Sequence, residues 1–241
     1  MQKHLQIPIE FSTKKCYTVL KYQISSADPQ GFEKGADMSK IITISRQYGS
    51  GGREIGERLA QEMGIPYYDN TLITRAAKES GFAEEAFEKA EEKATNSLLY
   101  SIAMGMNAYG NQDFGFANLS LDDRIYLAQS EIIRKVAEEG PCVIIGRCAD
   151  YVLKDRTDVL HIFIWADLEY RIKRATSLYH MSMEKAEEDV LKMDKRRANY
   201  YNYHANGKWG AAANYHLSLR SDTLGIENSV KLLKEFVEMQ G

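Results

Sequence analysis

The sequence has few cysteines and no long apolar run, and each absence excludes a class of protein. Three cysteines (Cys16, Cys142 and Cys148) are too few for a disulfide scaffold, so we expect reduced, structural thiols. No apolar stretch approaches the roughly 18 residues of a membrane-spanning helix. The first sixteen residues lack the uninterrupted apolar core of a signal peptide. We therefore expect a cytoplasmic protein that does not enter membranes.

A large excess of charge of one sign is also missing, because the net charge is only −3. This balance argues against bulk attraction to nucleic acid or to an anionic membrane. The five histidines show no metal-binding spacing such as H-E-x-x-H, and the segment GSGG lacks the G-x-S-x-G form of a serine hydrolase. Neither a histidine-bound metal nor a serine triad is indicated.

Short β-branched runs alternate with helical segments from Lys40 onward. The expected strands are residues 41–45, 66–70, 142–146, 159–166 and 216–221, and the expected helices are residues 53–63, 71–80, 120–140, 168–179, 182–204 and a C-terminal helix from 226. This alternation predicts an α/β fold, with a parallel sheet covered by helices on both faces. Ligands in such folds bind beyond the carboxyl ends of the strands.

Three further segments differ from this pattern. Residues 1–37 have a loop-like composition, and we expect them to be a disordered extension or a short appendage to the domain of residues 38–241. Residues 82–119 begin as a charged helix and end as a Gly/Asn-rich loop, so we expect a helical insert. Residues 182–210 are rich in cations and aromatics, and the family resemblance described below implies that they form a mobile lid.

A glycine-rich segment, SRQYGSGGREI, follows the first expected strand. Gly49, Gly51 and Gly52 let backbone N–H groups approach an anion without an intervening Cβ. The helix that starts near Arg53 adds its positive N-terminal end, so the segment is suited to phosphate. A tight strand-to-helix turn without a ligand is the alternative.

Arginines also follow the other strands or lie on the helices after them. Asp69 and Arg75 follow the second strand, and Gly146 and Arg147 follow the third. The cations of the next helices are Arg171, Arg174, Lys195, Arg196 and Arg197. Guanidinium groups that converge on one crevice suit several phosphates, because each one can bind two oxygens. Each arginine taken singly is better explained as a solvated surface charge, and only the set at the strand ends favours a phosphate site.

The ordered set of segments resembles the nucleoside monophosphate kinase group of P-loop proteins, and in particular the cytidylate kinase-like family. The segments that carry the resemblance are SRQYGSGG, DNTLITR, GRCAD, ADLEYRIKRA, DKRRANYY and YHLSLRSDTLGIENSV. The resemblance implies five parallel strands in the order 2-3-1-4-5, ATP as phosphoryl donor, and Mg²⁺. It also implies a nucleoside monophosphate kinase-like phosphotransferase.

The loop departs from true cytidylate kinases, which read D-G-x-S-G-A-G-K-G-T. Gly52 falls on the lysine, Glu54 on the magnesium-binding threonine, and Arg46 on the first glycine. Arg46 or Arg53 can supply the missing positive charge. Ser50 and Glu54 are the metal-binding candidates that remain.

Three functions are therefore open. The leading hypothesis is transfer of the γ-phosphoryl of ATP to a CMP- or dCMP-like monophosphate or a related small phosphate acceptor. Its expected donor-phosphate site is Gly49, Ser50, Gly51, Gly52, Arg53 and Glu54, its acceptor site is Asp69, Arg75, Gly146 and Arg147, and its catalytic cations are Arg46, Arg53, Arg147, Arg171, Arg174, Arg196 and Arg197. A weakly active or inactive nucleotide-sensing protein is the second hypothesis. A single-stranded nucleic-acid module, suggested by KRRANYYNYHANGKW, is the third, and we favour small nucleotides over it.

Overall fold

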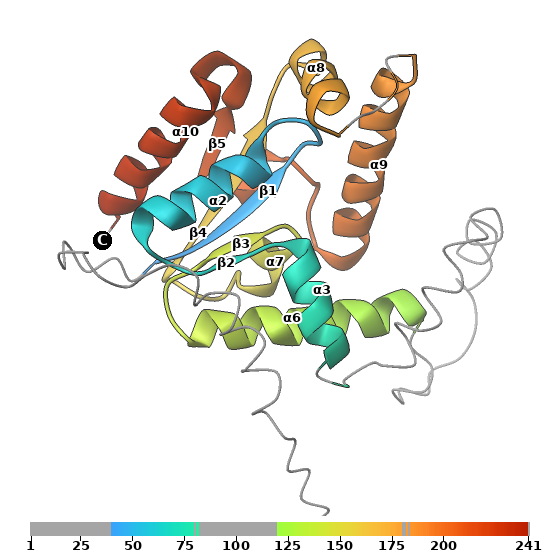
Figure 1. Ribbon diagram of the computed structural model, residues 1–241. Helices are drawn as coiled ribbons and strands as arrows, with labels where there is room; N and C mark the ends of the chain where they lie inside the picture. Colours follow the sequence, from blue (N-terminus) through green and yellow to red (C-terminus); the bar gives the residue numbers. More distant parts are fainter. Residues whose placement is uncertain (1–39, 80, 82–119, 180–181, 183, 241) are drawn as a thin grey trace, which may run out of the picture.

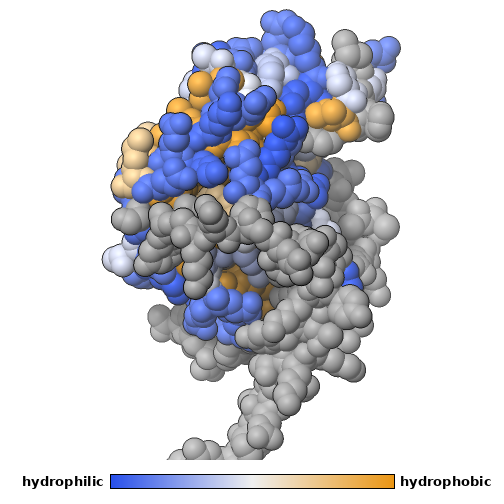
Figure 2. All heavy atoms as spheres, turned by 60° about the vertical axis from the view of Figure 1, so that its left-hand side comes forward, coloured by the Kyte–Doolittle hydropathy of each residue, from blue (hydrophilic) through white to orange (hydrophobic). Residues whose placement is uncertain are grey.

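The computed structural model describes residues 40–79, 81, 120–179, 182 and 184–240. The extension of residues 1–37 and the insert of residues 82–119 that the sequence predicts lie outside these residues. Within the described ranges no helix is long and apolar enough to cross a membrane. Figure 2 shows hydrophilic side chains over most of the described surface on one side of the molecule, with apolar atoms visible between them.

A five-stranded parallel sheet forms the centre of the domain, with strand order β2-β3-β1-β4-β5, as predicted. The strands are β1 (Ile41–Arg46), β2 (Tyr67–Tyr68), β3 (Val143–Ile145), β4 (Val159–Trp165) and β5 (Leu217–Arg220). The helices are α2 (Gly52–Met63), α3 (Asn70–Glu79), α6 (Leu121–Glu138), α7 (Ala149–Val152), α8 (Leu168–Tyr179), α9 (Ala186–His204) and α10 (Ser221–Glu238), with a short 3-10 turn at Ala212–Asn214.

Helices cover both faces of this sheet (Figure 1). Successive strand residues point to opposite faces. Ile42 and Ile44 of β1 therefore pack in one core with α2 and α10, and Ile41 packs in a second core with α3 and α6. On the second face β1 continues with Thr43 and Ser45, which are polar but buried. On this face β1 thus becomes polar toward its carboxyl end, where the glycine-rich loop starts.

Helix boundaries follow from the sequence. Gly64 ends α2 in the left-handed conformation that glycine adopts without strain. Ser120 caps α6 by accepting a hydrogen bond from the N–H of Asp123, as the S-x-x-D pattern predicts. The second strand is shorter than expected and comprises only Tyr67 and Tyr68. Because β2 is this short, α3 begins at Asn70 beside the carboxyl ends of β1 and β3.

Candidate active site

The loop between β1 and α2 has the backbone of an anion site. Gly49 and Gly51 adopt φ values of +77° and +80°, which side chains with a Cβ rarely adopt. A Cβ on Gly49 would lie 2.6 Å from the carbonyl oxygen of Arg171, so the loop packs directly on α8. No side chain caps α2. Its first N–H groups have no intrahelical acceptor and remain available to a bound anion.

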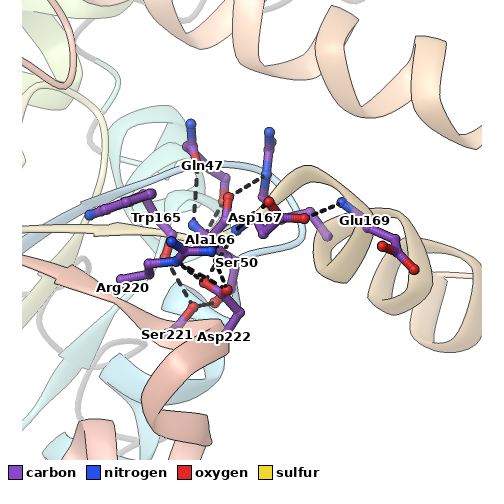
Figure 3. Close-up of polar contacts among 10 residues, drawn as sticks. Gln47, Ser50, Trp165, Ala166, Asp167, Glu169, Arg220, Ser221 and Asp222 are labelled. Atoms are coloured by element: carbon purple, nitrogen blue, oxygen red, sulfur yellow. Dashed lines mark hydrogen bonds and ion pairs between the residues drawn. The ribbon is translucent and has the colours of Figure 1, made fainter.

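Hydrogen bonds from β4 and α10 fix the base of this loop (Figure 3). The hydroxyl of Ser221 lies 2.6 Å from the carbonyl oxygen of Ser50 and 3.2 Å from that of Trp165. The side-chain oxygen of Gln47 accepts a bond of 3.2 Å from the N–H of Ala166. Ser50 itself is fully buried, and its hydroxyl donates to the carbonyl of Gln47. The Ser50 hydroxyl is therefore used inside the loop and does not face a ligand.

The charged side chains around the loop are paired with one another. Arg53 contacts Asp69 at 2.7 Å, while its own side chain is 62% exposed. Glu54 contacts both Arg58, at 2.6 Å, and Arg174, at 2.7 Å. Among the described residues, no group of three His, Cys, Asp or Glu side chains could hold a metal ion. Of the two metal candidates predicted from the sequence, the Glu54 carboxylate remains, and one carboxylate with phosphate oxygens and water is an arrangement that Mg²⁺ accepts.

Helix α9, within the predicted lid, is docked onto the same loop. Asp194 accepts a hydrogen bond of 2.6 Å from the N–H of Tyr48 and forms an ion pair of 2.5 Å with Arg171. Arg171 is buried and also donates to the carbonyl of Ala166. One turn beyond Asp194, Arg197 donates to the backbone carbonyl of Arg46 at 2.9 Å. Burial raises the pKa of Asp194 above its ordinary value.

A cavity of about 310 Å³ lies between α9 and the carboxyl ends of β1 and β3. The residues that line it are Ser45, Arg46, Asn70, Gly146, Arg147, Cys148, Met193, Arg196, Arg197, Tyr200, Tyr201 and Trp209. Four of these are arginines, and none of the described residues that line the cavity is Asp or Glu. A site of this composition favours an anion with more than one oxygen to bind.

A strained turn directs one of these arginines. Gly146, Arg147 and Cys148 follow β3 with φ values of +72°, +55° and +56°. Left-handed backbone at two successive non-glycine residues is unfavourable, and such strain concentrates at functional sites. Arg147 donates to the side-chain oxygen of Asn70 and stacks 5.4 Å from the centre of the Tyr200 ring. The turn therefore holds Arg147 against the amino end of α3.

Arg46, the last residue of β1, is the second arginine of the cavity floor. Burial lowers the pKa of Arg46 to about 9, assisted by the nearby Arg197 and Arg147 and opposed by Tyr67 and Asp69. Its guanidinium lies directly against Gly146, so a Cβ at that position would displace the end of the Arg46 side chain. The carboxylate of Asp69 acts on this guanidinium but is itself paired with Arg53.

The structure brings together some of the predicted site residues and separates others. Arg46, Gly146, Arg147, Arg196 and Arg197 line one cavity, whereas the remaining predicted arginines do not. Arg75 points to solvent and pairs with Glu79 at 2.8 Å, and Asp69 pairs with Arg53. Arg171 and Arg174 contact Asp194 and Glu54 behind and beside the loop.

Sequence reasoning missed Asn70 and Asp194. Asn70 lies next to Asp69, and at a strand end its amide was a recognisable polar candidate. The sequence signal for the cavity-facing side of α9 was the spacing of its residues. One face of this helix repeats at helical intervals and comprises Met193, Arg196, Arg197 and Tyr200. The lid aromatics Tyr201 and Trp209 also turn toward the cavity, and Trp209 packs edge-on against Phe163.

The fold and this loop define a P-loop kinase architecture. The structure of an uncharacterized protein from Eubacterium ventriosum is 24% identical and superposes with a TM-score of 0.63, over 83% of this chain and 99% of that one. The protein TT1252 from Thermus thermophilus is 17% identical, with a TM-score of 0.54 over 84% and 98% of the two chains. A shikimate kinase from Bacteroides thetaiotaomicron gives 16% identity and a TM-score of 0.48 over 83% and 98%.

The chain belongs to the cytidylate kinase-like family, whose sequence model matches residues 41–223. A search of curated proteins finds no significant match. Membership of this kinase family supports phosphoryl transfer to a small molecule as the class of activity.

Proposed function

We propose that the protein transfers the γ-phosphoryl group of ATP to a nucleoside monophosphate of the CMP or dCMP type, or to a closely related small phosphate ester. The observation that carries the proposal is the cavity with four arginines and no lining carboxylate, next to the glycine-rich loop. An acceptor that itself bears a phosphate matches this composition, because its charge compensates guanidinium groups that otherwise repel one another.

Each part of the site has a distinct task. The loop from Gly49 to Glu54 binds the donor phosphates through backbone N–H groups and the positive end of α2. Arg147 binds the acceptor phosphate, while Arg196 and Arg197 bring positive charge from α9. Mg²⁺ held by Glu54 and the phosphates would neutralise donor charge. The Arg53–Asp69 pair flanks the loop and orders the start of α3.

The transfer itself needs positioning and charge more than it needs a general base. The bond between the γ-phosphorus and the β–γ bridging oxygen breaks, and a bond to an oxygen of the acceptor phosphate forms. ADP leaves with the bridging oxygen and its negative charge. Arginines that surround the phosphoryl group stabilise charge that is spread over its oxygens in the transition state.

A second candidate function is nucleotide binding without transfer. The pairing of Glu54 with Arg58 and Arg174 favours it, since a metal ion has to displace these partners. The glycine at position 52 favours it too, because the loop then lacks its usual cation.

The deciding experiment measures ADP formation from Mg-ATP with CMP, dCMP, UMP, AMP, GMP and dTMP, and ATP binding in the same preparation. We expect turnover with one or two acceptors. Arg147→Ala should lower that turnover at least about 100-fold, the loss typical of a key charged contact, without loss of fold. Arg134→Ala is the matched control, because Arg134 is an exposed arginine on α6. ATP binding without ADP formation from any acceptor would instead support the second candidate.

A further inference from the structure

Arg46 and Gly52 compete for the same space. Gly52 has ordinary helical backbone, so conformation alone does not require glycine there. A Cβ on Gly52 would nevertheless lie 2.6 Å from the Cβ of Arg46 and 3.0 Å from its Cγ. Real Cβ atoms essentially never approach another carbon this closely, and the obstacle is the root of the Arg46 side chain, which cannot rotate away. With Arg46 present, residue 52 has to be glycine.

The positions involved are those at which the P-loop pattern has its lysine and its first glycine. In the pattern G-x-x-x-x-G-K-[ST], the first glycine corresponds to Arg46 and the lysine to Gly52. The lysine of that pattern reaches the β- and γ-phosphates of the donor. The chain therefore has a cation where the pattern has glycine, and glycine where the pattern has a cation. The two Cβ atoms would lie only 2.6 Å apart, so both side chains cannot be present together. Without the Arg46 side chain, a Cβ at position 52 still lies 3.3 Å from the Cβ of Ile164, a contact that only a small shift has to relieve.

Contacts distinguish Arg46 from the other cations near the loop. Arg53 is largely exposed and paired with Asp69, and Arg174 is paired with Glu54. The Arg46 guanidinium, in contrast, lines the cavity, and the carboxylate that acts on it, Asp69, is itself paired with Arg53. A half-buried cation without a carboxylate of its own is costly unless an anion meets it.

We propose that Arg46 and Gly52 form a reciprocal exchange, in which Arg46 replaces the P-loop lysine as the catalytic cation and contacts the phosphoryl group in transit. The inference rests on the proposed function. Arg46 starts beside α2 and extends across the end of β1 to Gly146 at the end of β3. Its charge therefore reaches the phosphoryl group from the acceptor side, where a lysine on α2 would approach from the donor side.

The exchange can be reversed by mutation. Arg46→Gly should lower turnover at least about 100-fold, because it removes a cation that acts in the transition state. The double variant Arg46→Gly with Gly52→Lys restores the usual pattern and should recover at least about tenfold over Arg46→Gly. The matched control, Arg46→Ala with Gly52→Lys, has the same lysine but keeps the obstructing Cβ, so it should recover nothing and unfold at a lower temperature.

Two results would overturn the inference. One is an unchanged turnover in Arg46→Gly. The other is a double variant that melts at the wild-type temperature and yet is no faster than Arg46→Gly. If the double variant fails to fold, Arg46→Gln tests the role of the charge instead, because it removes the charge and leaves the packing at Cβ and Cγ intact. It should show the same loss at an unchanged Tm, with Arg134→Gln as its control, and an undiminished rate would refute the role.

Failure of the proposed function is separable from failure of this inference. If the wild-type protein forms no ADP with any acceptor, the same variants are compared by calorimetric affinity for Mg-ATP and for inorganic tripolyphosphate. If Arg46 contacts the terminal phosphate, Arg46→Gly should bind both ligands at least tenfold more weakly than the wild-type protein. The double variant should restore the affinity. Equal affinities in all variants would show that Arg46 does not contact the bound phosphates.

Discussion

Asp150 in α7 makes the stability of this protein depend on pH in a way that can be calculated. The residue is 4% exposed, and neither carboxylate oxygen has a well-formed hydrogen bond within the described part of the chain. Desolvation raises the pKa of Asp150 from 3.8 to about 6, although Tyr201 and nearby N–H groups act in the opposite direction. We therefore expect the charged form of Asp150 to destabilise the fold, and Asp150→Asn to relieve that cost.

The direction follows from proton binding. A carboxyl group whose pKa is higher in the folded state binds its proton more tightly there than in the unfolded chain, so stability falls as pH rises from 3.8 to 6. Above pH 6 the full cost is present. A pKa difference of about 2, at about 1.4 kcal/mol per pKa unit, gives about 3 kcal/mol at pH 7.5 and about 1 kcal/mol at pH 4.5. Asparagine has the same shape and carries no charge at either pH.

Urea denaturation of wild-type protein and Asp150→Asn at both pH values measures this difference. Asp155→Asn is the control, because Asp155 is exposed and the chemical change is identical. The control should change the free energy of unfolding by less than about 0.5 kcal/mol at either pH. An Asp150→Asn variant that is less stable than wild type at pH 7.5 would refute the reasoning, and so would a gain that is equal at both pH values.

Three further predictions concern buried polar groups and thiols. Asp194→Ala leaves the buried guanidinium of Arg171 without its carboxylate and should cost about 3 kcal/mol; an unchanged Tm would contradict this. Ser221→Ala removes a 2.6 Å hydrogen bond to a loop carbonyl and should lower the free energy of unfolding in urea by about 1 kcal/mol. An unchanged free energy of unfolding would contradict this prediction. Burial raises the pKa of both Cys142 and Cys148 to about 12, so iodoacetamide at pH 8 should alkylate neither in the native protein and both in urea. Peptide mapping reads out the result, and labelling of either native thiol would count against it.

The strands of the sheet were predictable because they depend on the type and order of neighbouring residues. β-branched runs such as IITIS identify buried parallel strands, and the alternation with helices identifies the fold class. The strand order did not follow from alternation alone; the family resemblance supplied it, and the observed order confirms it. The length of β2 was overestimated because α3 already begins at Asn70, where Asp69 accepts a hydrogen bond from the N–H of Leu72.

The candidate site was only partly predictable, since its contacts join segments that are distant in the chain. Glycines and arginines at strand ends indicated the glycine-rich loop and the cavity lined by arginines. Nothing in the neighbouring sequence indicated that Arg171 would form an ion pair with Asp194, which lies on the following helix. The obstruction between Arg46 and Gly52 is likewise invisible in the sequence, because it depends on how closely α2 packs against the end of β1.

The distribution of charge partners fits the proposed exchange of the P-loop lysine for Arg46. Beside the loop, the cations Arg53, Arg171 and Arg174 each have a carboxylate within 2.7 Å, which orders the loop. In the cavity, by contrast, none of the described lining residues is Asp or Glu, the charges of Arg197 and Arg147 lower the pKa of Arg46, and Asp69, which opposes them, is itself paired with Arg53. Under the proposal, a bound anion compensates this positive charge. A lysine on α2 would place its charge among paired groups, whereas Arg46 at the end of β1 places it in the cavity where the proposal puts the acceptor phosphate.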